Sequence, residues 1–176
     1  MKKERLVLGG GCFWCIEAVY REVEGVLSAV SGYTGGKRKN PTYENICSGA
    51  TGHAEVVDIT YDGDVVSLDN LLEIFFVVHN PTTLNAQGAD KGTQYRSVIY
   101  YEDEEQHKQI NDAITIAQKG FSDKIVTEVS PLPKEVYPAE DYHQNYYNLN
   151  SNQGYCQVVI KPKLEKFYNL NVKVKK

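Results

Sequence analysis

Apolar residues recur along this chain with two different spacings, and each change of spacing marks a new predicted element. Short apolar runs bounded by turn residues predict strands over residues 5–8, 26–32, 55–61, 97–101 and 124–129. Apolar residues three and four positions apart predict helices over residues 12–23, from Ser67 to just before Asn80, and 103–118. A last short helix is expected over residues 141–149.

The order of these elements, βαββαβ followed by another helix and strand, predicts an α+β fold. The sheet should be mostly antiparallel, with helices packed on one of its faces. A length of 176 residues suits one domain, and the chain has no internal repeat, low-complexity tract or linker. We therefore expect residues 1–176 to form a single domain.

Charge and composition narrow the class of protein. The net charge is −4 and the isoelectric point about 5.6, whereas a general nucleic-acid binder is usually basic. No stretch approaches the ~18 apolar residues of a membrane span, and the first residues lack the apolar run of a signal peptide. We therefore expect a cytoplasmic protein with no nucleic-acid or membrane partner. The basic C-terminal segment, residues 161–176, has six lysines and one glutamate; we favour solvated lysines over an interaction arm.

The sharpest chemical signal follows the first strand, in the sequence Gly10-Gly11-Cys12-Phe13-Trp14. Glycines allow a sharp turn, and Cys12 then lies where a helix begins. Free N–H groups and the helix dipole favour a thiolate there, and the thiolate is the nucleophilic form of cysteine. Phe13 and Trp14 would wall an apolar pocket beside it. The alternative is a small buried cysteine among core aromatic residues.

The spacing of Cys12 and Cys15 permits two further interpretations. A thioredoxin-like redox pair needs a βαβ context, which the first strand and helix supply only in part. A zinc site needs a second pair of ligands, and Cys47 and Cys156 are single residues far apart. We expect no metal.

Glu55 is the second signal, because an alternating strand over residues 55–61 places it on the apolar face. Burial raises the pKa of a carboxyl group, so Glu55 is a candidate general acid unless it lies at a frayed, hydrated strand end. Two polar loops carry Tyr43, Asp90 and Tyr95, which are weak candidates on spacing alone. His143 has no obvious partner nearby in sequence, so we expect it to be structural.

Seven ordered motifs, distributed over nearly the whole chain, resemble the peptide methionine sulfoxide reductase A (MsrA) family. They are Gly-Cys-Phe-Trp at 11–14, Gly-Tyr-Thr-Gly-Gly at 32–36, Asn-Pro-Thr-Tyr at 40–43, Thr-Gly-His-Ala-Glu at 51–55, Gly-Thr-Gln-Tyr-Arg-Ser at 92–97, Ala-Glu-Asp-Tyr-His-Gln at 139–144 and Gly-Tyr-Cys at 154–156. The resemblance implies thiol-dependent reduction of the S epimer of methionine sulfoxide, free or in proteins. It also implies a ferredoxin-like βαββαβ core with long active-site loops and a C-terminal extension.

The resemblance implies a role for each candidate residue. The residue matching Cys12 attacks the sulfoxide sulfur, and the one matching Glu55 protonates its oxygen. Residues matching Tyr43, Tyr95 and Asp90 assist, while those matching Phe13 and Trp14 hold the substrate methyl group. No cofactor is implied, since a second thiol condenses with the sulfenic acid on Cys12 and thioredoxin then reduces the disulfide.

The resolving thiol stays open between two cysteines. Cys156 matches the resolving cysteine of the family, and we favour it. Cys15 stands where many relatives have glycine and shares a helical face with Cys12, so it is a second candidate, and a relay through both is possible. Cys47 matches a cysteine without a catalytic role, so we expect it to be structural.

Two rival functions remain. A thioredoxin-like disulfide oxidoreductase would use Cys12 and Cys15 and would not need Glu55. A non-enzymatic methionine-binding module would keep the aromatic pocket but tolerate the loss of Cys12. We expect a monomer in each case.

Overall fold

A six-stranded sheet forms the centre of the computed structural model, which describes residues 1–175. Its strands lie in the order β7-β6-β1-β3-β2-β8. The bounds are β1 (Lys3–Gly9), β2 (Val26–Thr34), β3 (Ala54–Asp62), β6 (Val98–Tyr101), β7 (Glu128–Pro131) and β8 (Tyr137–Pro138). All neighbouring pairs are antiparallel except β6 and β7. The prediction of a mostly antiparallel sheet is therefore confirmed.

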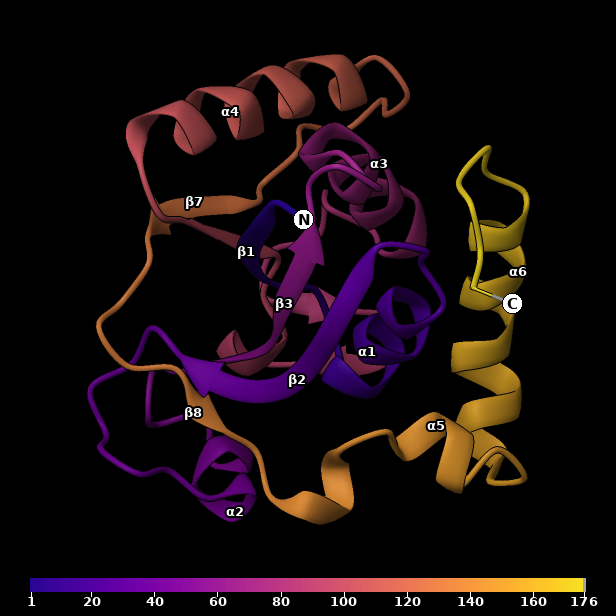
Figure 1. Ribbon diagram of the computed structural model, residues 1–176. Coiled ribbons are helices and arrows are strands. Elements are labelled where there is room, and N and C mark those ends of the chain that lie inside the picture. The colour runs from indigo at the N-terminus through magenta and orange to yellow at the C-terminus, as the bar shows by residue number, and fades with distance from the viewer. Residues whose placement is uncertain (176) are drawn as a thin grey trace.

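Two helices complete the predicted βαββαβ core. Helix α1 (Phe13–Arg21) connects β1 to β2, and α3 (Leu68–Val78) connects β3 to β6. The central order β6-β1-β3-β2 is that of a split βαβ, or ferredoxin-like, fold. Helix α4 (Glu104–Gln118) packs on α3 at the top of Figure 1, and α6 (Lys161–Tyr168) lies beside α1 at the right.

The main core lies between the sheet and α1, α3 and α6. Apolar residues spaced for a helix or a strand face each other there, and all of the following are fully buried: Leu6, Leu8, Ile16, Val19, Ile59, Leu71, Ile74, Phe75 and Phe167. The predicted start of the second helix is confirmed, since the Ser67 hydroxyl accepts a bond of 3.1 Å from the Asn70 N–H. Packing of α1 against β2 and β3 fixes the position of the residues that lead from β1 into α1.

The last predicted strand is shifted along the chain. Residues 124–129 were expected to be extended in the sheet, but pairing with β6 begins only at Glu128 and ends at Pro131. The Gln118 side chain binds the backbone of the turn between α4 and β7, where it also accepts a bond from the Ile125 N–H. The next N–H, that of Val126, donates to the Pro81 carbonyl. These bonds occupy backbone groups that a strand pattern alone assigns to the sheet.

The long loops contain short elements that periodicity does not indicate. The segment between β2 and β3 holds α2 (Tyr43–Cys47), whose Thr42 and Asn45 form a capping box. A small hairpin, β4 (Ala86–Gln87) and β5 (Asp90–Lys91), precedes a 3₁₀ turn (Thr93–Tyr95). The single helix expected over residues 141–149 is instead a 3₁₀ turn (Asp141–His143) and α5 (Tyr146–Leu149), separated by Asn145 in the left-handed region at φ 55°.

The basic C-terminal segment is packed rather than loose. A π-helical stretch (Cys156–Ile160) continues directly into α6, which buries Leu164 and Phe167. The last described residues fold back on the end of α1, where the Lys175 N–H donates to the Glu22 carbonyl at 2.8 Å. Most of the lysines between residues 161 and 175 are exposed to solvent, as expected. Within residues 1–175, no helix has the length and apolar composition needed to span a bilayer.

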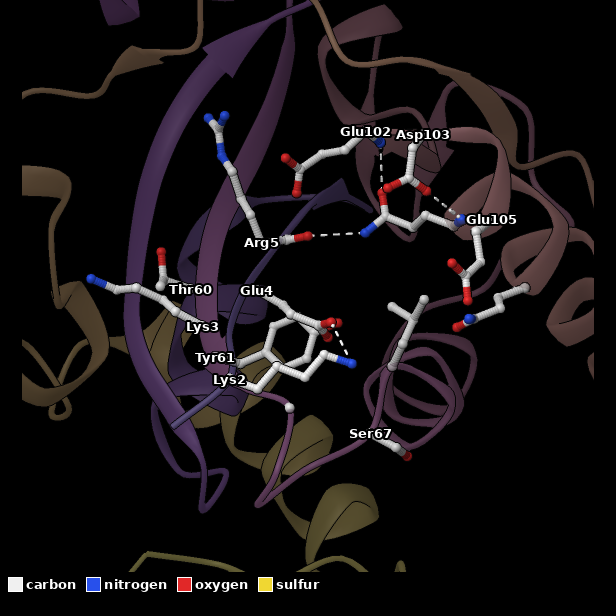
Figure 2. A pocket seen from close by; sticks show the side chains of 14 residues that line it. Lys2, Lys3, Glu4, Arg5, Thr60, Tyr61, Ser67, Glu102, Asp103 and Glu105 are labelled. Atoms are coloured by element: carbon white, nitrogen blue, oxygen red, sulfur yellow. Dashed lines mark hydrogen bonds and ion pairs between the residues drawn. The ribbon is translucent and has the colours of Figure 1, made fainter.

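A polar groove of about 620 Å³ opens at the N-terminal end of β1, between the ends of β3, α3 and α4 (Figure 2). Charged side chains of both signs surround it, among them Arg5, Glu102 and Asp103. No cysteine or histidine is among its lining residues. The groove lies at the opposite end of β1 from Cys12, so the thiol chemistry has to be sought elsewhere.

Candidate active site

The glycine turn after β1 places Cys12 where the sequence predicts. Gly11 has a φ of +81°, and its N–H donates to the Tyr95 carbonyl at 3.1 Å. A Cβ at Gly10 would approach the buried His79 ring to 2.7 Å, so a larger residue there would displace the turn. Cys12 is the N-cap of α1, with extended backbone angles, and it is partly exposed.

The electrostatics at Cys12 differ from the expectation for a helix start. The pKa of the Cys12 thiol lies well above its ordinary value, first because protein packed around the sulfur disfavours charge, then because of Glu55. The Trp14 N–H favours the thiolate, as expected, but is outweighed. The resting state therefore holds a thiol, and loss of the Glu55 charge would make the thiolate easier to form.

Glu55 is buried at the start of β3, with 1% of its surface exposed. Its Oε1 accepts a bond of 3.1 Å from the Phe13 N–H, the first helical donor after Cys12. Burial raises the pKa of Glu55 to about 8, against a small opposing effect of that hydrogen bond. The frayed, hydrated alternative is excluded, and near neutral pH the carboxyl group holds a proton beside the candidate nucleophile.

The two polar loops bring their candidate side chains to the same place. Tyr43 is the first residue of α2, and Tyr95 ends the 3₁₀ turn that holds Gly11. Burial raises the pKa of the Tyr95 hydroxyl, and the charges of Glu55 and Asp90 raise it further. Burial likewise raises the pKa of Tyr43, and the charge of Glu55 raises it further. Both phenols are therefore neutral hydrogen-bond donors close enough to Glu55 for its charge to raise their pKa.

Trp14 is held by three residues far away in sequence. Its indole Nε1–H donates to His143 Nδ1 at 3.0 Å, and the ring stacks on Tyr146 with centroids 3.7 Å apart and planes 7° apart. Tyr155 meets it edge-on at 5.7 Å. Phe13 is buried and packs on His143, with ring centroids 5.1 Å apart. We call His143 and Tyr146 the indole clamp.

A buried carboxylate anchors the indole clamp to α1. Glu17, with 1% exposure, accepts bonds of 2.6 Å each from the Ser31 hydroxyl, the Arg21 guanidinium and the Asn145 N–H. The last bond fixes Asn145, one of the two residues between His143 and Tyr146. His143 itself is buried, which lowers its pKa, and the bond from Trp14 requires a neutral ring with its proton on Nε2. The structural role that the sequence predicts for His143 is therefore to hold Trp14 and Phe13 in the candidate site.

Cys15 and Cys156 occupy different surroundings. Cys15 is buried one turn after Cys12, with its sulfur 3.7 Å from the Tyr155 hydroxyl, which donates to Asp90 at 2.9 Å. Cys156 is the next residue, buried at the start of the π-helical stretch. Both are free thiols, and burial raises the pKa of each. Tyr155 therefore links both thiol-bearing segments to the hairpin that carries Asp90.

Cys47 is exposed at the end of α2, whereas the other three thiols are buried or partly buried. Within residues 1–175, no three His, Cys, Asp or Glu side chains are placed to hold a metal ion together. The expectation that Cys47 has no catalytic role stays a prediction, and the structure places this residue in solvent at the end of a short helix.

Sequence reasoning missed three residues of the site: Glu17, Tyr146 and Tyr155. Tyr155 stood inside the Gly-Tyr-Cys motif, and Tyr146 follows the motif at 139–144 by two positions. Thirteen tyrosines, several of them in polar segments, were a signal that hydroxyl and ring contacts matter here. Glu17 gave no such signal, because its partners come together only in the folded chain.

Known proteins are similar to this chain over most of its length. A family model described as peptide methionine sulfoxide reductase matches residues 4–176. A protein of Polynucleobacter asymbioticus named peptide methionine sulfoxide reductase MsrA is 59% identical over 166 residues, 93% of this chain and 87% of that one.

Two solved structures of the yeast protein Mxr1 extend the likeness to the fold. Its reduced form, from Saccharomyces cerevisiae, matches with a TM-score of 0.83 at 35% identity, covering 88% of this chain and 90% of that chain. The same protein in complex with Trx2 matches with a TM-score of 0.60 at 26% identity, covering 82% of this chain and 85% of that one. With the family model spanning all but the first residues, this chain belongs to the peptide methionine sulfoxide reductase family.

Proposed function

We propose that Cys12 is the nucleophile and Glu55 the proton donor of methionine sulfoxide reduction. As a member of its family the chain is an oxidoreductase that reduces methionine sulfoxide with thiols. The observation that carries the assignment is the protonated, buried Glu55 carboxyl group, bonded to the helix start that Cys12 caps. Such a group can protonate an oxygen while the adjacent sulfur is attacked.

The proposed reaction balances without a cofactor. Glu55 donates its proton to the sulfoxide oxygen, with Tyr43 and Tyr95 as further donors, and the Cys12 proton passes to Glu55. The Cys12 sulfur attacks the sulfoxide sulfur and forms an S–S bond, and a second proton from Glu55 lets the oxygen leave as water when the S–O bond breaks. Water then attacks the Cys12 sulfur, the S–S bond breaks, and methionine leaves. Cys12 becomes a sulfenic acid, and Glu55 takes up the proton that the attacking water releases. Condensation with a second thiol forms a disulfide and releases water. Exchange with an external dithiol restores Cys12.

A direct assay tests the assignment of activity and epimer. Reduced protein with dithiothreitol is given a mixture of the two epimers of free methionine sulfoxide, and each is followed by chromatography. We expect loss of the S epimer and persistence of the R epimer, since the two epimers are served by separate enzymes. Consumption of the R epimer instead would contradict the proposal.

Cys156 is proposed as the resolving thiol, as its motif indicates. It lies in a π-helical stretch, a rare geometry that is frequent at functional sites. Local unwinding of this stretch, with release of Tyr155 from Asp90, would free Cys156 to reach Cys12. Cys15 is nearer along α1 and remains the alternative, directly or as a relay.

We expect Cys156→Ser to lose thioredoxin-supported turnover and to keep activity with dithiothreitol, because a small thiol can reduce the sulfenic acid without a resolver. Both Cys156→Ser and Cys15→Ser are assayed with each reductant, with Cys47→Ser as the matched control. Peptide mapping after one equivalent of substrate then identifies the disulfide. If Cys15→Ser shows the loss and Cys156→Ser behaves as wild type, Cys15 is the resolver.

Phe13 and Trp14 are proposed to hold the substrate methyl group, which gives the indole clamp a function. His143→Phe removes the acceptor for the indole N–H, whereas His143→Asn keeps an oxygen near the Nδ1 position. We expect His143→Phe to raise the substrate concentration for half-maximal single-turnover rate by roughly fivefold, the worth of about one hydrogen bond, with little change in the limiting rate. His143→Asn should restore much of this loss.

Trp14 is the only tryptophan, so its fluorescence reports on the indole clamp directly. In His143→Phe we expect emission at longer wavelength and easier quenching by acrylamide, since the ring is less tightly held. His107→Phe is the matched control, because that ring stacks on Tyr101 on another part of the surface. Equal fluorescence in His143→Phe and wild type would show that the indole clamp does not position Trp14.

We propose thioredoxin as the physiological reductant, supported by the complex of the yeast relative with Trx2. A cytoplasmic location is supported by four free cysteines, since a reducing compartment preserves thiols. We further propose that residues 1–176 act as one catalytic domain and as a monomer. Gel filtration with light scattering tests the monomer.

A further inference from the structure

Three consecutive cations, Lys37, Arg38 and Lys39, are exposed on the loop that joins β2 to α2. None of them forms an ion pair with any residue in the described part of the chain, 1–175. This is a concentrated positive charge on a protein whose net charge is −4. An unpaired cluster of this kind attracts anionic groups from solution.

The cations border a concave surface. Lys37 and Arg38 line a groove of about 560 Å³ whose opposite wall is α2 and the turn after it. The other lining residues are small, polar or acidic: Glu44, Asn45, Ser48, Ala50 and Thr51. With one acidic side chain against two lysine or arginine side chains, the lining is cationic, and we call it the cationic groove.

The backbone under the cationic groove is held in place before any ligand binds. The Gly36 N–H donates to His53 Nδ1 at 3.0 Å, which leaves the His53 proton on Nε2, and this proton is donated to the Arg38 carbonyl at 2.6 Å. The Lys37 N–H donates to the Thr51 carbonyl at 3.1 Å. His53 lies two residues before Glu55, so these bonds tie the cations to the strand that carries the acid, and little backbone ordering remains to oppose binding.

The cationic groove lies across α2 from the active site. On the face of α2 toward the active site, the Tyr43 and His143 ring centroids are 4.4 Å apart. The next residue of α2, Glu44, lines the groove. A helix with its side chains is about 10–12 Å across, and an extended peptide advances about 3.3 Å per residue. An extended peptide that runs from Cys12 across α2 spans this thickness in about three or four residues.

We propose that the cationic groove binds aspartate or glutamate side chains three or four residues from the oxidised methionine in protein substrates. This inference rests on the proposed attack by Cys12 and adds a substrate preference to it. The chemistry of the lining, ammonium and guanidinium groups beside amide and hydroxyl groups, fits a carboxylate. Free methionine sulfoxide does not extend to the groove and should be indifferent to it.

Competition between peptides tests the preference. Peptides with one central methionine S-sulfoxide carry a pair of Asp, Lys or Ser residues at the third and fourth positions on either side, and mass spectrometry follows them in one mixture with dithiothreitol. We expect the Asp peptide to exceed the Lys peptide in kcat/KM by roughly five- to tenfold at low salt for one of the two sides. The ratio should fall toward one at high salt, because exposed charges are screened.

Charge reversal identifies the groove. Lys37→Glu with Arg38→Glu should invert the preference and leave the reduction of free methionine sulfoxide unchanged. The matched control, Lys108→Glu with Lys119→Glu, makes the same change in net charge on the exposed face of α4, far from α2 in Figure 1, and should keep the wild-type preference.

Each contrary result overturns the inference in a distinct way. An absence of preference in wild type removes it, and an equal loss of preference in the α4 control assigns the effect to net charge. A fall in free methionine sulfoxide reduction confined to the loop variant shows that the loop supports the active site itself. If wild-type protein does not reduce free methionine sulfoxide at all, the proposed function fails first.

Discussion

Cys12→Ser should reduce turnover of methionine S-sulfoxide by several orders of magnitude, the largest single loss that we expect in this protein. A hydroxyl group is far less ionised than a thiol at neutral pH, and no other described cysteine caps a helix beside a protonated carboxyl group. Cys12 packs at the edge of the main core, and serine is close to it in size, so the fold should survive. Single-turnover loss of the S epimer is the measurement, with thermal unfolding to check the fold.

Cys47→Ser is the matched control for this substitution. Cys47 is exposed at the end of α2, and its removal should leave turnover nearly unchanged. A folded Cys12→Ser protein that still reduces the S epimer at a substantial rate would show that another group is the nucleophile. A non-enzymatic binding module would instead bind the sulfoxide with and without Cys12, and neither protein would reduce it.

Glu55→Gln should slow the chemical step by roughly 10²- to 10⁴-fold, the range for loss of a general acid. Glutamine keeps the size of the side chain and an oxygen for the Phe13 N–H, so the helix start should remain in place. If the single-turnover rate barely changes while substrate binding weakens, Glu55 positions the substrate rather than donating a proton. A thioredoxin-like exchanger would also be insensitive to this change.

The pH dependence gives Glu55 a signature of its own. Its pKa is raised from 4.5 to about 8 by burial, so the proton is present below pH 8 and lost above it. A wild-type rate that depends on this proton should fall as the pH rises through about 8. A rate that depends on the Cys12 thiolate should instead rise with pH. Whether the rate falls or rises above pH 8 therefore shows which of the two groups controls it.

The raised pKa of Glu55 also predicts a difference in stability between wild type and Glu55→Gln. A carboxyl group with a folded pKa above its unfolded value stabilises the fold most at low pH, and that stability is lost as the pH rises through the folded pKa. Glu55→Gln removes the charge that forms in the buried site, so at pH 9 the variant should unfold at a higher temperature than wild type. At pH 5 the two melting temperatures should lie closer together.

Much of the architecture follows from local properties of the sequence. Apolar spacing indicated the strands of the βαββαβ core and helices α1, α3 and α4, because these elements bury one face each and their periodicity records it. The glycine turn before Cys12 was also predictable, since a positive φ and a close backbone approach require glycine. Alternation in β3 placed Glu55 on the buried face.

Only the tertiary structure decided how these local features act together. Trp14 and His143 lie 129 positions apart, Tyr155 and Asp90 lie 65 apart, and no local pattern joins them. The start of β7 was set by bonds from Gln118 and to Pro81, which outcompeted an extended pattern at residues 124–127. The pKa values of Cys12 and Glu55 depend first on desolvation, and desolvation is a property of the packed protein rather than of any segment. The sequence alone therefore indicated which residues are candidates for the chemistry, while packing determined which of them hold protons and which hold one another in place.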